Sequence, residues 1–536
     1  MDNTRTLGEL LPRAAERDGG APAVHHGGLT LTWADAAVEA ARLGAALDLA
    51  GVGPGDRVGV HLRKSPEAFL AMHAVVQRGA IAVPFDPTAA SAYLAGVAER
   101  TGCAVVVTHA PCRRSALALA AGDQPTVRTV VGLAPGDDAT GVRCIGPDEI
   151  ADLEPVAPRP VDPDQPAYII TTSGSTGTPK GITHTHASAL AYVDFKRAAY
   201  DLEPSDRISD IAPNHFDIST LALWVTPAVG AANVVVPEPH QMLPASLSQL
   251  AADEGITVWY SVPYLLTQLL HRGQLDQKDL TALRWVLFGG EMFPPQVLAA
   301  LMARWPGARF SNVYGPAEVN ACTVHHLDAP PLGEDPIPVG RPVDTTEVRL
   351  VDLDTPDGPG TGGEPAPGRS GEIWVCARTM MAGYWERPDL DAATIVTDTG
   401  GRRWYRTGDL GYRRPGGELV FTGRVDHQVK VRGHRIELEA IEAVLEDVPG
   451  VANAVAAVAR PGDGADVIVA GLVTSVEAAG PPDADALRRH AARYLPAYAI
   501  PVAFLPITAL PTTGSGKLDR RAIRAELAAR CQPEGK

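Results

Sequence analysis

The sequence has few cysteines and no long apolar run, and both scarcities narrow what the protein can be. The six cysteines are scattered and form no C-x-x-C pair: Cys103, Cys112, Cys144, Cys322, Cys376 and Cys531. This spacing argues against a disulfide framework and against a zinc site. No apolar run approaches the length of a membrane span, and the N-terminal stretch "MDNTRTLGELLPRAAERDGG" lacks the apolar core of a signal peptide. We therefore expect a cytoplasmic protein with no membrane partner.

Basic residues are also scarce relative to acidic ones. The chain has 47 Lys and Arg against 63 Asp and Glu, a formal net charge of −16, which disfavours nucleic acid as a partner. From His427 onward there are 13 basic and 13 acidic residues, so the whole deficit lies before that point. The last fifth of the chain is thus electrostatically a different unit. A length of 536 residues itself suggests two to four structural units.

Up to about residue 420, short β-branched runs alternate with Ala/Leu-rich helical stretches. The runs "CAVVVTH", "AANVVVPE", "TVWYSV" and "RWVLFGG" each lie near a helical segment such as "SLSQLAADEG" or "PPQVLAALMARW". This alternation predicts α/β layers with parallel sheet. The Gly/Pro-rich segment 355–368 would suggest a boundary, but "GEIWVCA" follows as one more strand. We therefore keep it within the same unit, as part of a small β-subdomain.

Beyond residue 425 the pattern is that of a compact α+β domain. The segment "ELEAIEAVLEDV" places Leu438, Ile441, Leu445 and Val448 on one helical face. Two strands, "ANAVAAVAR" and "DVIVAGLVT", and a second helix, "DALRRHAARYL", follow. We predict an α/β fold in which a large N-terminal core, residues 1–425, carries a small α+β domain, residues 426–536.

The stretch "TSGSTGTPKG", Thr172 to Gly181, is a glycine-rich loop between an expected strand, "AYIIT", and a helix that begins near Thr185 or Ser188. This setting is typical of backbone N–H groups that bind an anion. The loop fits neither the P-loop pattern nor the dinucleotide fingerprint. Only seven of the 47 basic residues are lysines, so Lys180 inside this loop indicates a need for a compact, mobile charge.

Several further motifs follow in order: "FDIST", "NVYGPAEVNACT", "GEIWVCARTMMAGYW", "WYRTGDLG", "GRVDHQVKVRGHRIE" and "TGSGKLD". With the glycine-rich loop they resemble the class I adenylate-forming superfamily, which includes acyl-CoA synthetases, luciferases and the adenylation domains of nonribosomal peptide synthesis. The resemblance covers almost the whole chain, from "LTWADAAVEAARLGAAL" to "PTTGSGKLDRR". One such motif alone is weak evidence for this family, whereas the complete series in family order is specific to it.

The resemblance implies that ATP and Mg²⁺ are the cofactors. It assigns Glu318 to Mg²⁺, an ion that prefers hard oxygen ligands, Tyr314 to stacking on adenine, and Asn312 to the adenine amino group. Asp409 is similar to the carboxylate that holds the ribose hydroxyls, with Arg424 supporting it. The resemblance places these further residues around the nucleotide: Thr172, Ser173, Gly174, Ser175, Thr176, Gly177, Lys180, Gly290, Glu291 and Lys430.

The same resemblance gives roles to two residues near the small domain. Lys517 is similar to the lysine that enters the site and bridges the substrate carboxylate and the α-phosphate, so Lys517 and Lys180 are the expected catalytic residues. Asp426 is similar to the hinge on which the small domain turns between adenylation and thiol transfer. Two reactions that share one pocket need such a switch.

Asp217 in "FDIST" favours an α-amino acid substrate, because a buried carboxylate is costly unless it is paired, and an α-ammonium would pair with it. The remaining positions that the resemblance assigns to the pocket are apolar with one tyrosine: Ile218, Leu221, Tyr260, Leu287, Gly289, Val313, Ala321 and Cys322. The substrate side chain is therefore expected to be small and apolar. An alanine at Gly289 is expected to shrink the pocket.

This set looks most like that of the free-standing L-prolyl ligases that load carrier proteins. It departs from them at Ile218, Gly289, Val313 and Ala321, where Leu, Ala, Leu and Val are usual. L-proline is the first candidate, and alanine, glycine, pipecolate or a methylproline stay open.

No carrier domain with its serine attachment motif follows Lys517, so we expect transfer of the aminoacyl group to the phosphopantetheine thiol of a separate carrier protein, as in antibiotic biosynthesis. The need for a small accessory activator protein stays open. The alternatives are an acyl-CoA synthetase-type enzyme that uses CoA, which Asp217 disfavours, and an inactive nucleotide-binding module, which the intact motifs disfavour.

Overall fold

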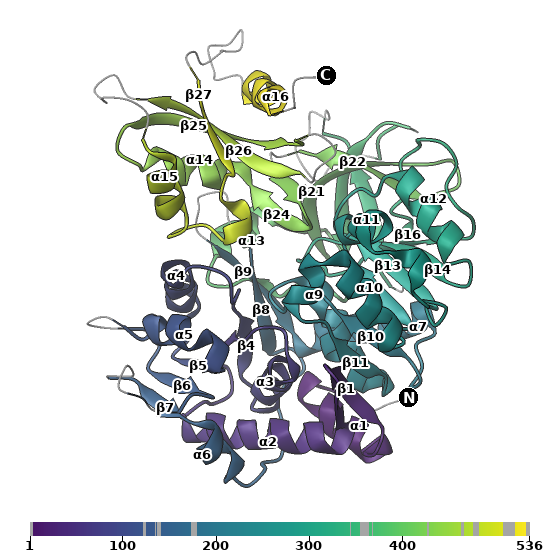
Figure 1. The fold of residues 1–536 in the computed structure, drawn as a ribbon. Coiled ribbons are helices and arrows are strands. Elements are labelled where there is room, and N and C mark those ends of the chain that lie inside the picture. Colours follow the sequence, from purple (N-terminus) through teal and green to yellow (C-terminus); the bar gives the residue numbers. More distant parts are fainter. Residues whose placement is uncertain are drawn as a thin grey trace. The chain divides into compact units, whose positions relative to one another are not determined.

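The computed structural model describes residues 4–121, 125–134, 136, 141–172, 179–343, 345–353, 364–366, 368–425, 428–461, 466–474, 482–507 and 520–531. The chain separates into two compact units. The first comprises Met1–Pro87, Ala98–Thr171 and Gly181–Val425, and the second comprises Thr88–Val97, Thr172–Lys180 and Asp426–Lys536. Figure 1 labels their elements.

Two large sheets organise the first unit. Among the described residues, one sheet has nine strands in the order β16 (Arg341–Pro342), β15 (Thr323–Leu327), β14 (Arg309–Tyr314), β13 (Trp285–Gly289), β12 (Val258–Ser261), β10 (Arg207–Asp210), β11 (Ala232–Val235), β1 (Pro22–His26), β2 (Leu29–Thr32). The other, counted over the same residues, has eight: β19 (Gly383–Tyr384), β9 (Lys180–Thr185), β8 (Pro166–Thr172), β4 (Ile81–Pro84), β3 (Arg57–His61), β5 (Val105–Thr108), β6 (Thr129–Val131), β7 (Arg143–Ile145).

Most neighbouring strands of these sheets run parallel. The pairs β10–β11, β12–β13 and β13–β14 are parallel, as are β3–β4 and β3–β5, whereas β15 joins β14 antiparallel. Strands β5, β11, β12 and β13 coincide with the predicted apolar runs, and their residues are almost all buried. The α/β prediction with parallel sheet is confirmed.

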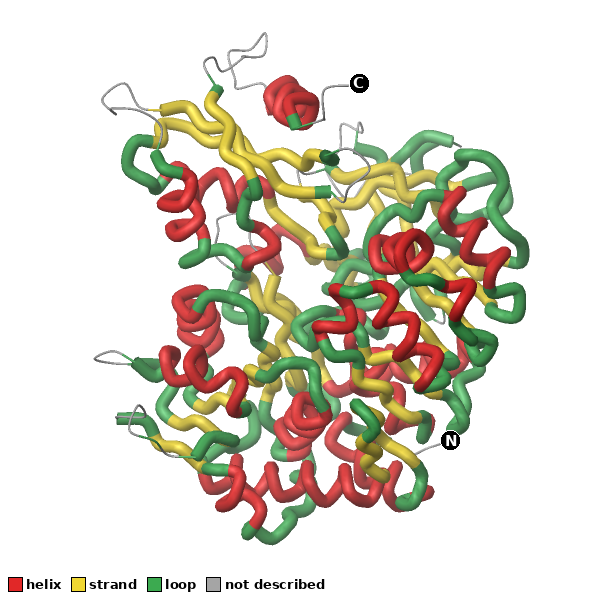
Figure 2. Tube along the Cα trace, viewed as in Figure 1, coloured by secondary structure: helices red, strands yellow, loops and turns green. Residues whose placement is uncertain are grey.

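Helices connect the parallel strands and pack on their faces, as the red and yellow layers of Figure 2 show. The helices in or adjoining the first unit are α1 (Leu10–Asp18), α2 (Trp33–Leu49), α3 (Pro66–Gln77), α4 (Ser91–Thr101), α5 (Arg113–Leu119), α6 (Pro147–Ala151), α7 (His186–Tyr200), α8 (Thr226–Val229), α9 (Glu238–Met242), α10 (Pro244–Asp253), α11 (Pro263–Arg272), α12 (Pro295–Arg304) and α13 (Pro388–Thr394). Helix α7 begins as predicted: the Thr185 side chain accepts from the Ser188 N–H and the Ser188 hydroxyl accepts from the Thr185 N–H, a capping box.

A third sheet forms the small β-subdomain of the first unit. Its strands run β17 (Glu347–Val351), β18 (Gly371–Cys376), β21 (Arg403–Arg413), β20 (Ile395–Thr397), and β22 (Leu419–Arg424) also pairs with β21. Strand β18 contains the "GEIWVC" run that follows the Gly/Pro-rich segment. The segment 355–368 therefore connects two antiparallel neighbours, β17 and β18, within one unit.

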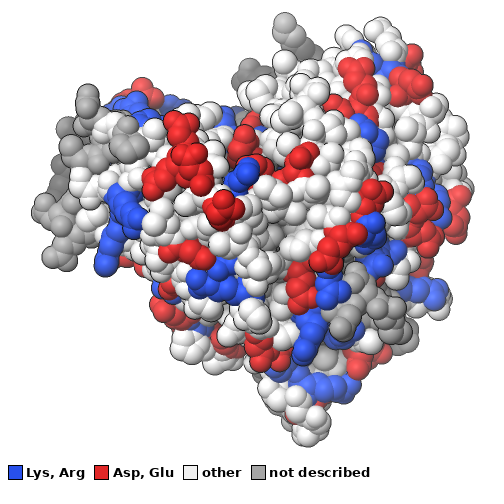
Figure 3. All heavy atoms as spheres, turned by 90° about the horizontal axis from the view of Figure 1, so that it is seen from below, with Lys and Arg blue, Asp and Glu red and all other residues white. Residues whose placement is uncertain are grey.

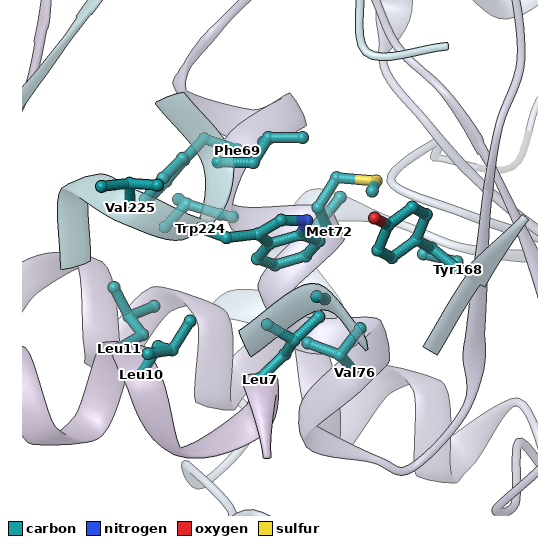
Figure 4. Close-up of a cluster of buried hydrophobic side chains, with 14 of the residues drawn as sticks. Leu7, Leu10, Leu11, Phe69, Met72, Val76, Tyr168, Trp224 and Val225 are labelled. Carbon is teal, nitrogen blue, oxygen red and sulfur yellow. The ribbon is translucent and has the colours of Figure 1, made fainter. Parts of the chain in front are cut away.

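The core of the first unit gathers around Trp224, whose side chain has no exposed surface. Figure 4 shows the indole with Leu7, Leu10 and Leu11 on one side and Phe69 on the other. The ring of Tyr168 from β8 stacks with its centroid 6.1 Å away. Segments more than 200 residues apart thus bury a shared apolar surface, and this burial is the main favourable term in folding.

The second unit contains a hairpin and a small mixed sheet. Strands β23 (Gln428–Val431) and β24 (His434–Glu437) pair antiparallel, and β25 (Val451–Ala459), β26 (Val467–Thr474) and β27 (Ala503–Pro506) form the sheet. Its helices include α14 (Leu438–Glu446), α15 (Ala484–Ala491) and α16 (Arg520–Arg530). The predicted apolar face of α14 is buried, which confirms an α+β pattern here.

On the face shown in Figure 3, acidic and basic side chains are interspersed. Among the residues that the structure describes, no helix combines the length and the apolar character needed to cross a bilayer.

Candidate active site

Three adjacent parallel strands of the first unit place four of the predicted pocket residues on one face of a sheet. Tyr260 on β12 lies opposite Leu287 on β13, and Gly289 on β13 lies opposite Val313 on β14. Because side chains alternate along a strand, residues two apart and residues in register share a face. The sequence therefore brings these positions together near the carboxyl ends of parallel strands, where open α/β sheets bind ligands.

Helix α7 packs on this same face. The carbonyl oxygen of Tyr200 accepts a hydrogen bond of 2.9 Å from the Trp285 indole N–H, and the Tyr200 hydroxyl lies 3.2 Å from Ser311 Oγ. Trp285 precedes Leu287 by two residues, and Ser311 precedes Val313 by two. Helix α7 is thus fixed against the residues predicted to line the pocket.

Asp217 begins a short 3₁₀ helix, Asp217–Ser219, that leads into a π-helical turn, Leu221–Val225. Its side chain is half-buried, and its Oδ1 accepts a hydrogen bond of 3.0 Å from the Ile218 N–H. Burial raises the pKa of Tyr260 well above its ordinary value, and Tyr192 and then the charge of Asp217 add smaller shifts in the same direction. One hydrophobic cluster contains the predicted lining residues Ile218, Leu221, Tyr260, Leu287, Val313 and Ala321.

The side chains predicted to hold adenosine form a connected group. The Tyr314 hydroxyl donates to Asp409 Oδ2 over 2.7 Å, and Arg424 donates to the other carboxylate oxygen of Asp409. Asp409 on β21 lies in register with Arg424 on β22, and its side chain is 2% exposed. A carboxylate held this way is a fixed acceptor for hydroxyl groups.

The Asn312 amide nitrogen donates to the Pro338 carbonyl oxygen over 2.9 Å. This bond fixes the orientation of the amide, whose oxygen is the atom able to accept from an amino group. Gly290 follows β13 with φ of +92°, in the left-handed region that favours glycine. Glu291 accepts a hydrogen bond of 3.3 Å from the Tyr264 N–H.

Glu318, the predicted metal ligand, is fully buried. Its Oε1 accepts a hydrogen bond of 2.8 Å from the Tyr384 hydroxyl, which lies 3.2 Å from the Tyr405 hydroxyl. Cys322, predicted to line the pocket, is buried and donates through Sγ to the Tyr314 carbonyl oxygen over 3.4 Å. Tyr384 and Tyr405 were absent from the predicted site, because nothing in their local sequence marks them as partners of Glu318.

The second unit holds the remaining described candidates. Lys180 Nζ lies 3.5 Å from Glu437 Oε1, and Gln428 donates to the same carboxylate oxygen. Thr172 ends β8, and Lys430 lies on β23 opposite Arg435. The predicted residues Ser173, Gly174, Ser175, Thr176, Gly177, Asp426 and Lys517 lie outside the described residues.

Gly289 does not behave as predicted. A Cβ placed on it would lie 2.3 Å from the Val313 carbonyl oxygen, far inside van der Waals contact. An added methyl group would therefore displace the neighbouring strand rather than fill the pocket, which corrects the expectation for alanine at this position.

A buried lysine on α7 is the main feature that the sequence prediction missed. The Lys196 side chain has no exposed surface, and its Nζ lies 4.9 Å from the centroid of the Tyr260 ring. Desolvation lowers the pKa of Lys196 to about 7, and the charge of Asp217 acts in the opposite direction. The scarcity of lysine in this chain was the signal that could have found it.

Comparisons with known proteins identify the family of the chain. The family model of the AMP-binding enzymes matches residues 11–385, and that of the AMP-binding enzyme C-terminal domain matches residues 440–517. An L-proline–[L-prolyl-carrier protein] ligase of Pseudomonas fluorescens is 34% identical over 89% of this chain and 90% of its own length. A second such ligase, of Streptomyces coelicolor, is 32% identical over 96% of this chain and 95% of its own length.

Other relatives are longer proteins, of which the chain spans less than half. Phenyloxazoline synthase MbtB of Mycobacterium sp. (strain MCS) is 34% identical over 93% of this chain, which covers 40% of that protein. Among solved structures, the amide bond synthetase McbA of Marinactinospora thermotolerans superposes with a TM-score of 0.83 at 26% identity, over 97% of this chain and 99% of that one. These matches confirm the resemblance read from the motifs: the chain belongs to the AMP-binding enzymes, the class I adenylate-forming superfamily.

Proposed function

We propose that the enzyme activates a small α-amino acid with ATP and passes it to the thiol of a separate carrier protein. In the first step a carboxylate oxygen of the amino acid attacks the α-phosphorus, and pyrophosphate leaves. In the second step the thiol sulfur attacks the acyl carbon, and AMP leaves with the attacking oxygen. The observation that carries the proposal is that Tyr260, Leu287 and Val313 share one face of the sheet, and that Ile218, the residue after Asp217, packs against the same hydrophobic cluster.

L-proline is the first substrate candidate. Asp217 supplies a negative charge suited to an α-ammonium group, and the predicted lining residues around it are buried and mostly apolar. The names of the two prolyl ligases that match most of this chain support the same choice. Alanine, glycine, pipecolate and methylproline are the other candidates that fit a small pocket.

The nucleotide would be held by side chains whose chemistry suits it. Asp409 offers fixed acceptors for ribose hydroxyls, Asn312 an amide oxygen for the adenine amino group, and Tyr314 an aromatic ring. Lys180 and the glycine-rich loop from Thr172 to Gly177 would hold the β- and γ-phosphates. In this assignment Gly290, Glu291, Arg424 and Lys430 support the nucleotide.

Glu318 would hold Mg²⁺, which neutralises charge on the phosphates. Mg²⁺ is usually bound by one or two carboxylates together with phosphate oxygens. The donor chemistry fits that habit, because Glu318 supplies one carboxylate and the Tyr384 hydroxyl fixes its orientation. Lys517 would supply positive charge where the two reacting anions meet, and residues 426–536 would form the mobile domain that turns about Asp426.

The test is ATP–pyrophosphate exchange with the purified enzyme across single amino acids. We expect exchange with proline or another small amino acid, above the blank without amino acid. Strong exchange with lysine or a fatty acid, and none with small amino acids, would contradict the substrate proposal. Offering CoA and a phosphopantetheinylated carrier protein in parallel separates the two acceptors, and we expect the thioester to form on the carrier.

A further inference from the structure

Lys196 on α7 is buried in a way that needs an explanation. Its side chain has no exposed surface, and Nζ has no hydrogen-bond partner among the described residues. An ammonium group offers three donors and no acceptor. Buried polar groups are nearly always hydrogen-bonded, so an unpartnered buried amine needs an explanation, such as an ordered water, an ion or a ligand.

Four aromatic rings surround the amine. The Nζ atom lies 4.9 Å from the ring centroid of Tyr260, 5.1 Å from those of Phe195 and Tyr200, and 5.3 Å from that of Tyr192. Ring faces attract a cation electrostatically, but they do not replace the directional oxygen acceptors that an ammonium has in water. The rings stabilise the charged amine but offer no oxygen acceptor, so its N–H donors have no partner among the described residues.

The position of the amine connects it to the proposed substrate. Tyr260, the nearest ring, lies opposite Leu287 on the sheet face that carries the predicted lining residues. Burial lowers the pKa of Lys196, and the charge of Asp217 opposes that shift. The proposed site for an amino acid thus contains a carboxylate for its ammonium group and, within electrostatic reach, a buried amine.

We propose that Lys196 is a specificity residue that donates a hydrogen bond to an oxygen acceptor on the side chain of the activated amino acid. This inference rests on the proposed function, the ATP-dependent activation of a small amino acid, and shifts its substrate class to side chains that bear an oxygen, which the candidates named above lack. The acceptor is a hydroxyl, carbonyl or carboxylate oxygen on a small side chain. Proline has no such oxygen, so a hydroxyl- or keto-substituted ring is the better substrate within the ring series.

The experiment measures kcat/KM for pyrophosphate exchange with amino acids of similar size or ring, of which one member of each pair has an oxygen acceptor on its side chain. The pairs are proline with 4-hydroxyproline and with 4-oxoproline, valine with threonine, alanine with serine, and leucine with asparagine and with aspartate. A site built to hydrogen-bond a substrate oxygen discriminates strongly against the analogue that lacks it. We expect the wild type to favour the oxygen-bearing member of at least one pair by more than about tenfold. Asparagine against aspartate tells a neutral acceptor from an anionic one.

The Lys196→Met variant tests whether this preference depends on the amine. Methionine keeps an unbranched chain and removes the donor, so the preference should fall to about threefold or less, or reverse. Lys278→Met is the matched control, because Lys278 is an exposed lysine that bonds to Gln249 on the surface. The wild-type preference should persist in that control.

Two outcomes would overturn the inference. A wild type that favours the apolar member of every pair would show that the amine does not hydrogen-bond to the substrate side chain. If Lys196→Met keeps the full preference for oxygen-bearing substrates, another residue must recognise the oxygen. Exchange with no amino acid at all would instead refute the proposed function and the inference that rests on it, so the two failures are distinguishable.

Discussion

The hydroxyl of Tyr384 offers a precise test of the proposed metal site, because it touches Glu318 and nothing in the proposed reaction requires it to touch substrate. It donates to Glu318 Oε1 over 2.8 Å, and Glu318 is fully buried. The Tyr384→Phe variant removes that one donor and keeps the ring, which is 4% exposed and lies in one hydrophobic cluster with Ile373 and Tyr405 of the β-subdomain.

Two effects follow from the loss of this hydrogen bond. A hydrogen bond to a charged group contributes about 1.5–3 kcal/mol, so the free energy of unfolding should fall by that amount. Groups that orient a metal ligand typically affect metal affinity by about 10- to 100-fold. The Mg²⁺ concentration that gives half-maximal exchange should therefore rise by roughly one to two orders of magnitude.

Urea unfolding measures the first effect, and a Mg²⁺ titration of pyrophosphate exchange at saturating ATP measures the second. Tyr412→Phe is the control, because Tyr412 lies half-buried on β21, the strand of Asp409, and has no part in the proposed site. A Tyr384→Phe variant that loses stability but keeps the wild-type Mg²⁺ dependence would refute the assignment of Glu318 to the metal.

The remaining predictions concern Lys517, Gly289 and Asp426. Lys517→Ala should slow pyrophosphate exchange by several orders of magnitude, because it removes charge at the reacting phosphate, while transfer from pre-made aminoacyl-AMP largely survives; equal losses in both half-reactions would contradict its role. Gly289→Ala should lower the free energy of unfolding by about 1–3 kcal/mol, since its methyl group meets the Val313 backbone; unchanged urea unfolding would contradict this. Asp426→Pro fixes φ and removes the freedom of a hinge, so it should preserve one half-reaction within a few-fold and abolish the other; undiminished rates for both would place the hinge elsewhere.

The sequence was sufficient where local pattern determines structure. The β-branched runs of β12 and β13 are strands, and Thr185 and Ser188 cap α7, because strand burial and helix capping depend on residues close in the chain. The order of motifs also identified the family before any geometry was known. These features need no knowledge of which distant segments meet.

The contacts that the sequence could not predict join residues far apart. Glu318 and Tyr384 are 66 residues apart, and Tyr314 and Asp409 are 95 apart, so their hydrogen bonds depend on how the sheets of the first unit pack together. The parallel pairing of β27 with β26 is likewise a tertiary result. Lys196 lay within a predicted helix, but only the packed structure shows that its amine is buried among four rings.

The central claim, that a carboxylate oxygen of an amino acid attacks the α-phosphorus of ATP, has one most direct test. The best amino acid from the exchange screen is supplied with ¹⁸O in both carboxylate oxygens, together with ATP and a carrier protein that bears the phosphopantetheine thiol. The AMP released after transfer is then weighed by mass spectrometry. The account predicts one ¹⁸O atom in the AMP phosphate, since the attacking oxygen leaves with AMP. Unlabelled AMP, or ADP and labelled phosphate in its place, would contradict it.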